Sequence, residues 1–209
     1  MPEMDPNIAL IIKLLLTSLI VAVGALIQGS AGFGSALVAA PLLVLIDPQY
    51  VPGPLMCAMI ILNALIIYRE RLSIDLKGLQ LSILGLVFGT VPAILVLNII
   101  NESTFSLIFG SIILLAVIVS FLGGKIKETK TVLFFGGCLS GFMNTISTIG
   151  GPPMALIYQH EKGPKLRGML AGFFLISNII SMVALILSHN FVLNDLLMFL
   201  PMIPGVLLG

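Results

Sequence analysis

Long apolar stretches recur along the chain, and short polar segments separate them. Residues 8–26 are apolar apart from Lys13, Thr17, Ser18 and Gly24. Four similar stretches cover residues 76–100, 105–122, 131–149 and 168–187. Apolar runs of about 20 residues are long enough to cross a bilayer as helices. The pattern therefore predicts an all-α integral membrane protein.

The breaks between the apolar stretches divide the chain into two membrane units, 1–122 and 131–209, joined by a linker at 123–130. In the first unit we expect helices at about 8–28, 34–46, 52–70, 76–98 and 104–122. In the second we expect helices at about 131–146, 151–160 and 167–188, with another from about residue 194.

Two of the expected helices are short, and each follows a stretch rich in glycine or polar residues. At 1.5 Å per residue, neither 34–46 nor 151–159 comfortably crosses about 30 Å of hydrocarbon. They follow GSAGFG and NTISTIGGPP. Irregular backbone at membrane depth is tolerated where protein covers it or where it lines a cavity. Short, interrupted segments at corresponding places in two halves predict a transporter binding site at the repeat interface.

The two units resemble each other in sequence. Aligning GALIQGSAGFGSALVAAPLLVLI with GGCLSGFMNTISTIGGPPMALIY places Gly24, Gly29, Ser35 and Pro41 on Gly136, Gly141, Ser147 and Pro153. After a short insertion, Gly53, Asn63, Gly85 and Gly89 meet Gly168, Asn178, Gly205 and Gly209. Matches in colinear order predict a duplication. The second unit then stops at the counterpart of Gly89, so we expect a chain truncated at its C-terminus, with a natural short form as the alternative.

Charge is scarce, and its placement predicts the orientation. Charged residues make up 9% of the chain and hydrophobic residues 58%, whereas a soluble domain is about 25% charged. Because loops rich in Lys and Arg stay in the cytoplasm, we expect 69–77, 123–130 and 160–167 there. Loops 47–52 and 188–195 carry no Lys or Arg and are expected outside.

Equivalent loops of the two units have opposite charge bias, which predicts inverted-topology repeats. Arg69, Arg71, Lys165 and Arg167 are interpreted as topology determinants, with an electropositive vestibule as a second interpretation. Lys13 is expected to extend to the membrane interface. The GxxxG pairs at Gly85 and Gly89, Gly137 and Gly141, and Gly205 and Gly209 are interpreted as helix-packing positions.

Neutral hydrogen-bonding residues accompany the two breaks. A helix that begins inside the membrane offers free N–H groups and the positive end of its dipole to an anion. The candidate substrate-binding residues are Gln28, Gly29, Ser30, Gly32, Phe33, Gly34, Ser35, Asn63, Ser140, Asn144, Thr145, Ser147, Thr148, Gly150, Gly151, Pro152 and Asn178. No Lys or Arg lies in these breaks, which favours reversible binding. For Asn63 and Asn178, hydrogen bonding between helices is an equal alternative.

The sequence offers no pattern for a metal centre, a cofactor or catalysis. His160 and His189 are isolated, Cys57 and Cys138 lie in apolar segments, and HExxH, CxxC and Walker motifs are absent. Carboxylates do not fall deep within an expected helix, so a proton relay has no candidate. We therefore expect no metal, no cofactor and no enzyme activity.

The strings IQGSAGFGSALVAAPLLVLIDP, IGGPPMALIY and RGMLAGFFLISNIIS resemble the TauE/SafE family of sulfite and organosulfur exporters. The family pattern is a glycine-rich break leading into a proline-containing helix, repeated once. The matching residues are Gly29, Gly32, Phe33, Gly34 and Pro41, then Gly141, Gly150, Gly151, Pro152 and Pro153. The resemblance covers nearly the whole chain and implies a permease of the bacterial inner membrane for sulfite, sulfonates or related small anions. The last helices expected of the family are absent.

We therefore expect a secondary transporter that exports a small anion, with sulfite or an organosulfonate as the leading substrate, by alternating access between two inverted halves. An anion channel of the same architecture and a carrier of a non-sulfur anion are the alternatives. The expected partners are membrane lipid and the anion. Protons and a homo-oligomer stay open, and nucleic acid is not expected.

Overall fold

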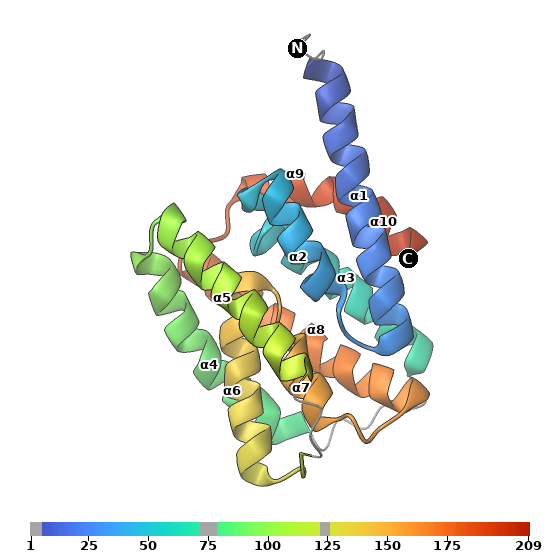
Figure 1. Ribbon diagram of the computed structural model, residues 1–209, viewed down its shortest axis with the longest axis vertical. Helices are drawn as coiled ribbons and strands as arrows, with labels where there is room; N and C mark the ends of the chain where they lie inside the picture. Colours follow the sequence, from blue (N-terminus) through green and yellow to red (C-terminus); the bar gives the residue numbers. More distant parts are fainter. Residues whose placement is uncertain (1–5, 72–78, 122–125) are drawn as a thin grey trace.

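The computed structural model describes residues 6–71, 79–121 and 126–209, and regular structure within these residues is entirely helical (Figure 1). The elements are α1 (Pro6–Ala31), α2 (Ser35–Ile46), η1 (Pro48–Tyr50), α3 (Gly53–Glu70), α4 (Gln80–Ile99), α5 (Glu102–Phe121), α6 (Lys130–Ser147), α7 (Gly151–Ile157), α8 (Gly163–Leu187), α9 (Leu193–Phe199), η3 (Leu200–Met202) and α10 (Ile203–Leu208). The all-helical prediction is confirmed. Residues 72–77 and 123–125 of the expected basic loops lie outside the described residues.

Four helical segments of the described chain are long and apolar enough to cross a membrane. They are Pro6–Ala31, Pro48–Glu70, Gln80–Ile99 and Gly163–Leu187. The expected spans at 105–122 and 131–149 are not among them. α5 spans 20 residues, of which Thr104–Ser120 is the part with described side chains, and α6 carries several polar residues in its second half. The membrane-protein class is confirmed, and the crossings expected at 105–122 and 131–149 stay predictions.

Helix boundaries agree with the sequence expectations to within a few residues, and the larger differences have local causes. α8 begins at Gly163 rather than near 167, because Pro164 occupies a first-turn position where its missing N–H costs nothing. α7 ends at Ile157. The last expected helix is divided by η3, with Pro201 and Pro204 in the short elements.

Buried and exposed positions have the pattern of a protein whose outer surface faces lipid. Large apolar side chains stand on the outside, among them Leu15 (65% exposed), Leu95 (61%) and Leu107 (74%). The interior holds polar side chains such as Ser181 and Thr17, both fully buried. Since lipid provides no hydrogen bonds, polar groups in such a protein are paired inside.

α4 lies along α6 in the most extensive helix contact of the fold (Figure 1). A Cβ added to Gly85 or Gly89 would collide with the backbone oxygen of Phe134 or Cys138 on α6. Glycines of α6 face the backbone of α4 in the same way. Close helix packing through small residues is thus confirmed for this pair.

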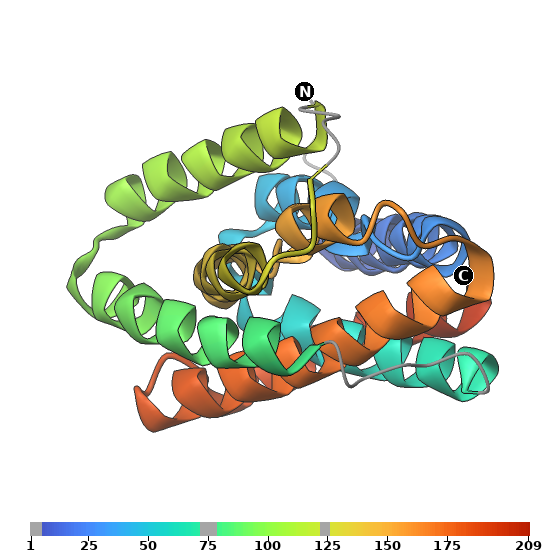
Figure 2. The same ribbon diagram turned by 90° about the horizontal axis from the view of Figure 1, so that it is seen from below.

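α10 lies along α1 by the same means (Figure 1). A Cβ on Gly205 or Gly209 would collide with the backbone oxygen of Ser18 or Ala22. α3 lies along α8 in the second most extensive contact, and Figure 2 shows these two helices crossing beneath the others. α1 with α2, and α6 with α7, form two tight pairs of a long and a short helix.

Candidate functional site

The break between α1 and α2 depends on glycine. Gly32 and Gly34 have φ of +90° and +108°, a left-handed region that side chains with a Cβ rarely adopt. Gly34 is the N-cap of α2. Gly24 permits the close approach of the two helices, because a Cβ there would lie 2.9 Å from Ser35 Oγ. The sequence GSAGFG therefore ends α1 and starts α2 within three residues.

The break between α6 and α7 reaches the same result with different residues. Thr148 has φ of +63° and closes α6 through its N–H to Asn144 O at 2.7 Å. Ser147 Oγ accepts from Ile149 N at 3.2 Å, and Ser140 Oγ donates to Gly150 O at 2.5 Å. These side chains supply hydrogen bonds to backbone groups of the irregular segment, which lipid could not supply. α7 then begins at Gly151.

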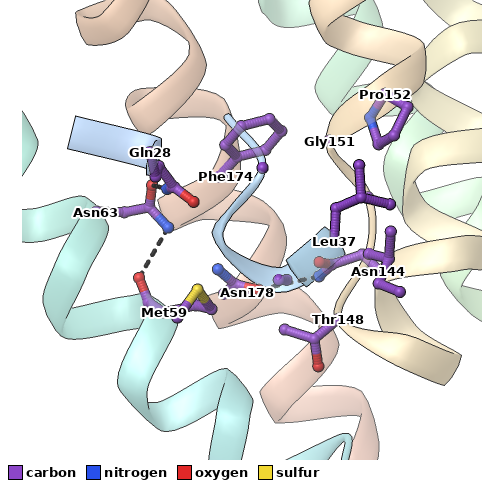
Figure 3. A pocket seen from close by; sticks show the side chains of 14 residues that line it. Gln28, Leu37, Met59, Asn63, Asn144, Thr148, Gly151, Pro152, Phe174 and Asn178 are labelled. Atoms are coloured by element: carbon purple, nitrogen blue, oxygen red, sulfur yellow. Dashed lines mark hydrogen bonds between the residues drawn. The ribbon is translucent and has the colours of Figure 1, made fainter. Parts of the chain in front are cut away.

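A small cavity lies where the two breaks meet (Figure 3). Its walls are Gln28, Gly34, Ala36, Leu37, Met59, Asn63, Asn144, Thr148, Ile149, Gly150, Gly151, Pro152, Phe174 and Asn178. About 30 Å³ is open to the centre of a water-sized sphere, and one buried water needs about 10–15 Å³ by this measure. The cavity as it stands has room for about two waters.

Two amide pairs stand on the cavity wall (Figure 3). Gln28 Nε2 donates to Asn63 Oδ1 at 2.7 Å, and Asn63 Nδ2 donates to Met59 O at 2.7 Å. All three residues come from α1 and α3. Both amide side chains are at most 4% exposed, so their mutual hydrogen bond satisfies groups that would be costly to bury alone.

The second pair joins α6 to α8. Asn144 Nδ2 donates to Asn178 Oδ1 at 3.1 Å and to Ser181 Oγ at 3.2 Å. Thr145 Oγ1 hydrogen-bonds Ser181 Oγ at 2.9 Å. Asn178 Nδ2 has no acceptor among the described residues. Because Asn178 lines the cavity, this amide is a donor available to a ligand.

The first turn of α2 supplies further donors. The first helical bond at this end is Val38 N to Gly34 O at 3.1 Å, so the N–H groups of Ser35, Ala36 and Leu37 find no acceptor in the described residues. Ala36 and Leu37 line the cavity. Free N–H groups and the positive end of the dipole favour an anion. The start of α7 is poorer in donors, because Pro152 and Pro153 have no N–H.

The cavity wall is electrically neutral. None of its lining residues, all of which are described, is charged. Glu70, which accepts from Arg69 and Arg167 beside the α1–α2 break, is not among the lining residues. A ligand in the cavity would be held by dipoles and hydrogen bonds, with no full counter-charge on the wall.

The structure brings nine of the sequence-predicted site residues to this cavity and leaves the rest away from it. Those on the wall are Gln28, Gly34, Asn63, Asn144, Thr148, Gly150, Gly151, Pro152 and Asn178. Those off the wall are Gly29, Ser30, Gly32, Phe33, Ser35, Ser140, Thr145 and Ser147. Most of the second group support the breaks: Ser140 and Ser147 bond backbone, and Thr145 bonds Gly141 O and Ser181.

Five wall residues were not predicted: Ala36, Leu37, Met59, Ile149 and Phe174. Met59 and Phe174 each lie one helical turn before an asparagine of the wall, Asn63 or Asn178. Residues four apart share a helix face, so this periodicity was the signal that could have identified them. Ala36 and Leu37 follow Gly34 in the first turn of α2.

Several wall residues lie in pairs that are separated by nearly the same number of residues along the chain. Gln28, Gly34 and Ala36 are separated from Asn144, Gly150 and Pro152 by the same number of residues. Met59 and Asn63 are separated from Phe174 and Asn178 by one residue fewer. The cavity is thus lined by both breaks and by two long helices, α3 and α8.

Metal ligands are not grouped in the part of the chain that the structure describes: no three His, Cys, Asp or Glu side chains there could hold an ion together. Cys57 and Cys138 are free thiols.

Comparison with known proteins agrees with the architecture. The model of the family described as sulfite exporter TauE/SafE matches residues 16–209. A search of curated proteins and a search of solved structures gave no match. Apolar helices long enough to cross a bilayer place the chain in a membrane. The chain therefore belongs to the sulfite exporter TauE/SafE family of membrane transport proteins.

Proposed function

We propose that this chain is a secondary transporter that exports a small oxyanion, with sulfite as the leading substrate, and that the cavity between the two breaks is the substrate site. One observation carries the proposal: Ala36, Leu37 and Asn178 line one neutral cavity, and each has an N–H group without an acceptor in the described residues. Neutral donors stabilise an oxyanion without the tight capture that a Lys or Arg would give. A carrier must release its substrate.

The size of the cavity favours the smaller members of the substrate class. Room for about two waters suits an anion with three oxygens better than an organosulfonate with an added carbon chain. Met59 and Phe174 limit the space from α3 and α8. A larger sulfonate would require these side chains to move.

The matched walls support two inverted repeats and alternating access. α4 of the first half packs on α6 of the second, while α10 of the second half packs on α1 of the first, each through a pair of glycines. Reciprocal exchange of this kind is expected when two equivalent halves are related by an axis through the site. The contacts favour Asn144 as the counterpart of Gln28, about one helical turn from the register that the sequence alignment gave.

We place the protein in the bacterial inner membrane with its basic segments in the cytoplasm, and the positions of the described basic residues support this orientation. Arg69 and Arg167 meet at the Gly29 end of α1, whereas Lys13 and Asp47 pair near its other end. Under the positive-inside rule the Gly29 end faces the cytoplasm. The membrane potential then favours exit of an anion. Because the cavity wall carries no carboxylate, any coupled proton would travel on the substrate itself, as hydrogen sulfite.

Flux of radiolabelled sulfite into proteoliposomes tests the proposal, with sulfate and ethanesulfonate as competitors. We expect saturable flux that unlabelled sulfite on the opposite side accelerates. Gly34→Leu should abolish it, since Gly34 has φ of +108° and caps α2 at the cavity. Gly110→Leu is the matched control, because a Cβ there meets nothing within 4 Å.

Two outcomes would contradict the proposal. Absence of sulfite flux from well-folded protein would remove the sulfur anion as substrate. Flux that neither saturates nor responds to sulfite on the opposite side would indicate the alternative, a channel of the same architecture.

A further inference from the structure

An ionic cluster closes the α1–α2 break on the side away from the cavity. Glu70 Oε1 accepts from Arg69 Nε at 3.0 Å and from Arg167 Nε at 2.8 Å. The Glu70 side chain is only 8% exposed, against 22% for Arg167 and 52% for Arg69. The cluster joins the end of α3 to the start of α8.

The same arginines hold the break itself. Arg69 Nη2 donates to Gly29 O at 2.6 Å. A Cβ on Gly32 would lie 3.3 Å from Arg167 Cα. Gly29 directly follows Gln28, which lines the cavity. The strand of backbone from Gly29 to Gly34 is therefore the partition between the cavity and the cluster.

Some N–H donors of the two arginines are not bound by the Glu70 carboxylate. Both Nε groups converge on one oxygen, Oε1. The two terminal nitrogens of Arg167 find no acceptor in residues 6–71, 79–121 and 126–209. Two guanidinium groups share one carboxylate, so the described cluster has an excess of positive charge. Guanidinium binds carboxylates and other oxyanions through the same planar fork.

We propose that Arg69 and Arg167 form a second anion site, behind the α1–α2 break on its cytoplasmic side, and that Glu70 occupies it as a tethered anion until a small oxyanion takes its place. The displaced carboxylate would release the link between α3 and α8, and Arg69 would remain next to the partition at Gly29. This inference rests on the proposed function for its substrate class and its orientation, while binding at the two sites can be measured separately.

The opposite side of the cavity lacks such a site. There Thr148 Oγ1 donates to Pro52 O at 3.3 Å. Pro52 is separated from Arg167 by the same number of residues as Asn63 is from Asn178. A neutral, long hydrogen bond is weaker than a double ion pair with a buried carboxylate. Within the described residues the two sides of the cavity therefore differ, and the side bearing Arg69 and Arg167 has the charge to gather anions.

Equilibrium dialysis of the purified chain with radiolabelled sulfite under nitrogen tests both sites by counting bound ions. The wild-type chain should bind about one sulfite at low concentration, in the cavity, because Glu70 fills the second site. Glu70→Gln should bind about two, since the tethered competitor has lost its charge. Adding Asn144→Leu should remove the cavity ion alone, and adding Arg167→Gln should remove the other.

A second measurement covers the case in which Glu70→Gln does not fold. At high sulfite the wild-type chain should show a weak second binding phase as the ion displaces Glu70, and Arg167→Gln should lose this phase. Arg71→Gln is the matched control: Arg71 lies over the Tyr68 ring at 4.7 Å and makes no ion pair with Glu70 in the described residues.

The two proposals fail in different ways. If Glu70→Gln binds no more sulfite than the wild-type chain, and Arg167→Gln leaves the high-concentration phase intact, the second site does not exist. If instead the wild-type chain binds no sulfite at low concentration while Glu70→Gln binds one ion that Arg167→Gln removes, the arginine site stands and the cavity assignment is wrong.

Discussion

Asn144 donates its amide to Asn178 Oδ1, and this bond leaves Asn178 Nδ2 free at the cavity wall. The two asparagines therefore have different functions: Asn144 positions its partner, and Asn178 offers the donor. Substituting aspartate at each position in turn distinguishes these two functions. Asn178→Asp keeps the accepting oxygen and replaces the free donor with a second carboxylate oxygen, whereas Asn144→Asp loses the donor that holds Asn178 and Ser181.

We predict that Asn178→Asp loses sulfite binding by about 10- to 100-fold or more, while its thermal unfolding midpoint falls by less than that of Asn144→Asp. A lost charge-assisted hydrogen bond and a repelling carboxylate act in the same direction. Asn144→Asp should lower the unfolding midpoint further, because it leaves the buried Asn178 Oδ1 without its donor, at about 1–3 kcal/mol, while Ser181 keeps its hydrogen bond with Thr145. Equal loss of stability in both variants would show that Asn178 serves packing alone.

The aromatic wall of the cavity predicts a change in selectivity. Phe174→Ala enlarges the space beside Asn178, so ethanesulfonate should become a better competitor of sulfite flux relative to the wild-type chain. Phe135→Ala is the matched control, since Phe135 is 63% exposed on the outer surface. Unchanged competition by ethanesulfonate in Phe174→Ala would contradict the view that this ring sets the size limit.

The glycine contacts between α4 and α6 predict a strong effect on stability. Gly89→Ala places a methyl group against the backbone oxygen of Cys138, and helices cannot move apart without losing the rest of their contact. Overpacking of this kind costs about 1–3 kcal/mol. Thermal unfolding in detergent measures it, with Gly110→Ala in α5 as the control. A wild-type unfolding midpoint in Gly89→Ala would mean that the α4–α6 contact is looser than described.

The ion pair between Lys13 and Asp47 predicts a pH dependence of stability. Lys13 Nζ lies 2.8 Å from Asp47 Oδ2 and 5.5 Å from the centre of the Tyr50 ring. The hydrogen bond from Lys13 lowers the pKa of Asp47. A lowered pKa in the folded state means that the pair stabilises the fold above the ordinary aspartate value of about 3.9, and that this stability is lost as the pH falls through the folded-state pKa.

Asp47→Asn removes this contribution, which for a partly exposed pair is about 1 kcal/mol or less. The difference in unfolding midpoint between the wild-type chain and Asp47→Asn should be constant near neutral pH and disappear in acid. A difference that grows as the pH falls would contradict the pairing. Lys13 was expected to extend to the membrane interface, and in the structure its ammonium group pairs with Asp47.

Much of this architecture follows from the sequence, because its signals are local. Apolar run length predicts helices, and Gly32, Gly34, Pro152 and Pro153 mark the breaks through backbone conformations and missing N–H groups that these residue types impose. The amide residues of the wall were identified for the same reason: a polar side chain in an apolar segment needs a partner or a ligand.

The remainder depends on how helices rotate and cross, which no short stretch encodes. Met59 and Phe174 look like ordinary apolar positions until α3 and α8 turn them toward the breaks. Ser35 and Ser140 look like ligand donors, yet both are fully buried away from the cavity wall. The partnership of Glu70 with Arg167 joins residues 97 positions apart, and charge counting assigned that arginine to topology first and to an electropositive vestibule second.

The most direct test of the central claim is to locate the anion. Selenite has the shape and charge of sulfite, and its selenium gives an anomalous X-ray signal. Crystals of the chain grown with selenite should show one strong selenium peak in the cavity, within hydrogen-bonding distance of Asn178 Nδ2 and the first N–H groups of α2. An empty cavity at a selenite concentration that inhibits sulfite flux, whether or not a peak appears at Arg69 and Arg167, would contradict the account.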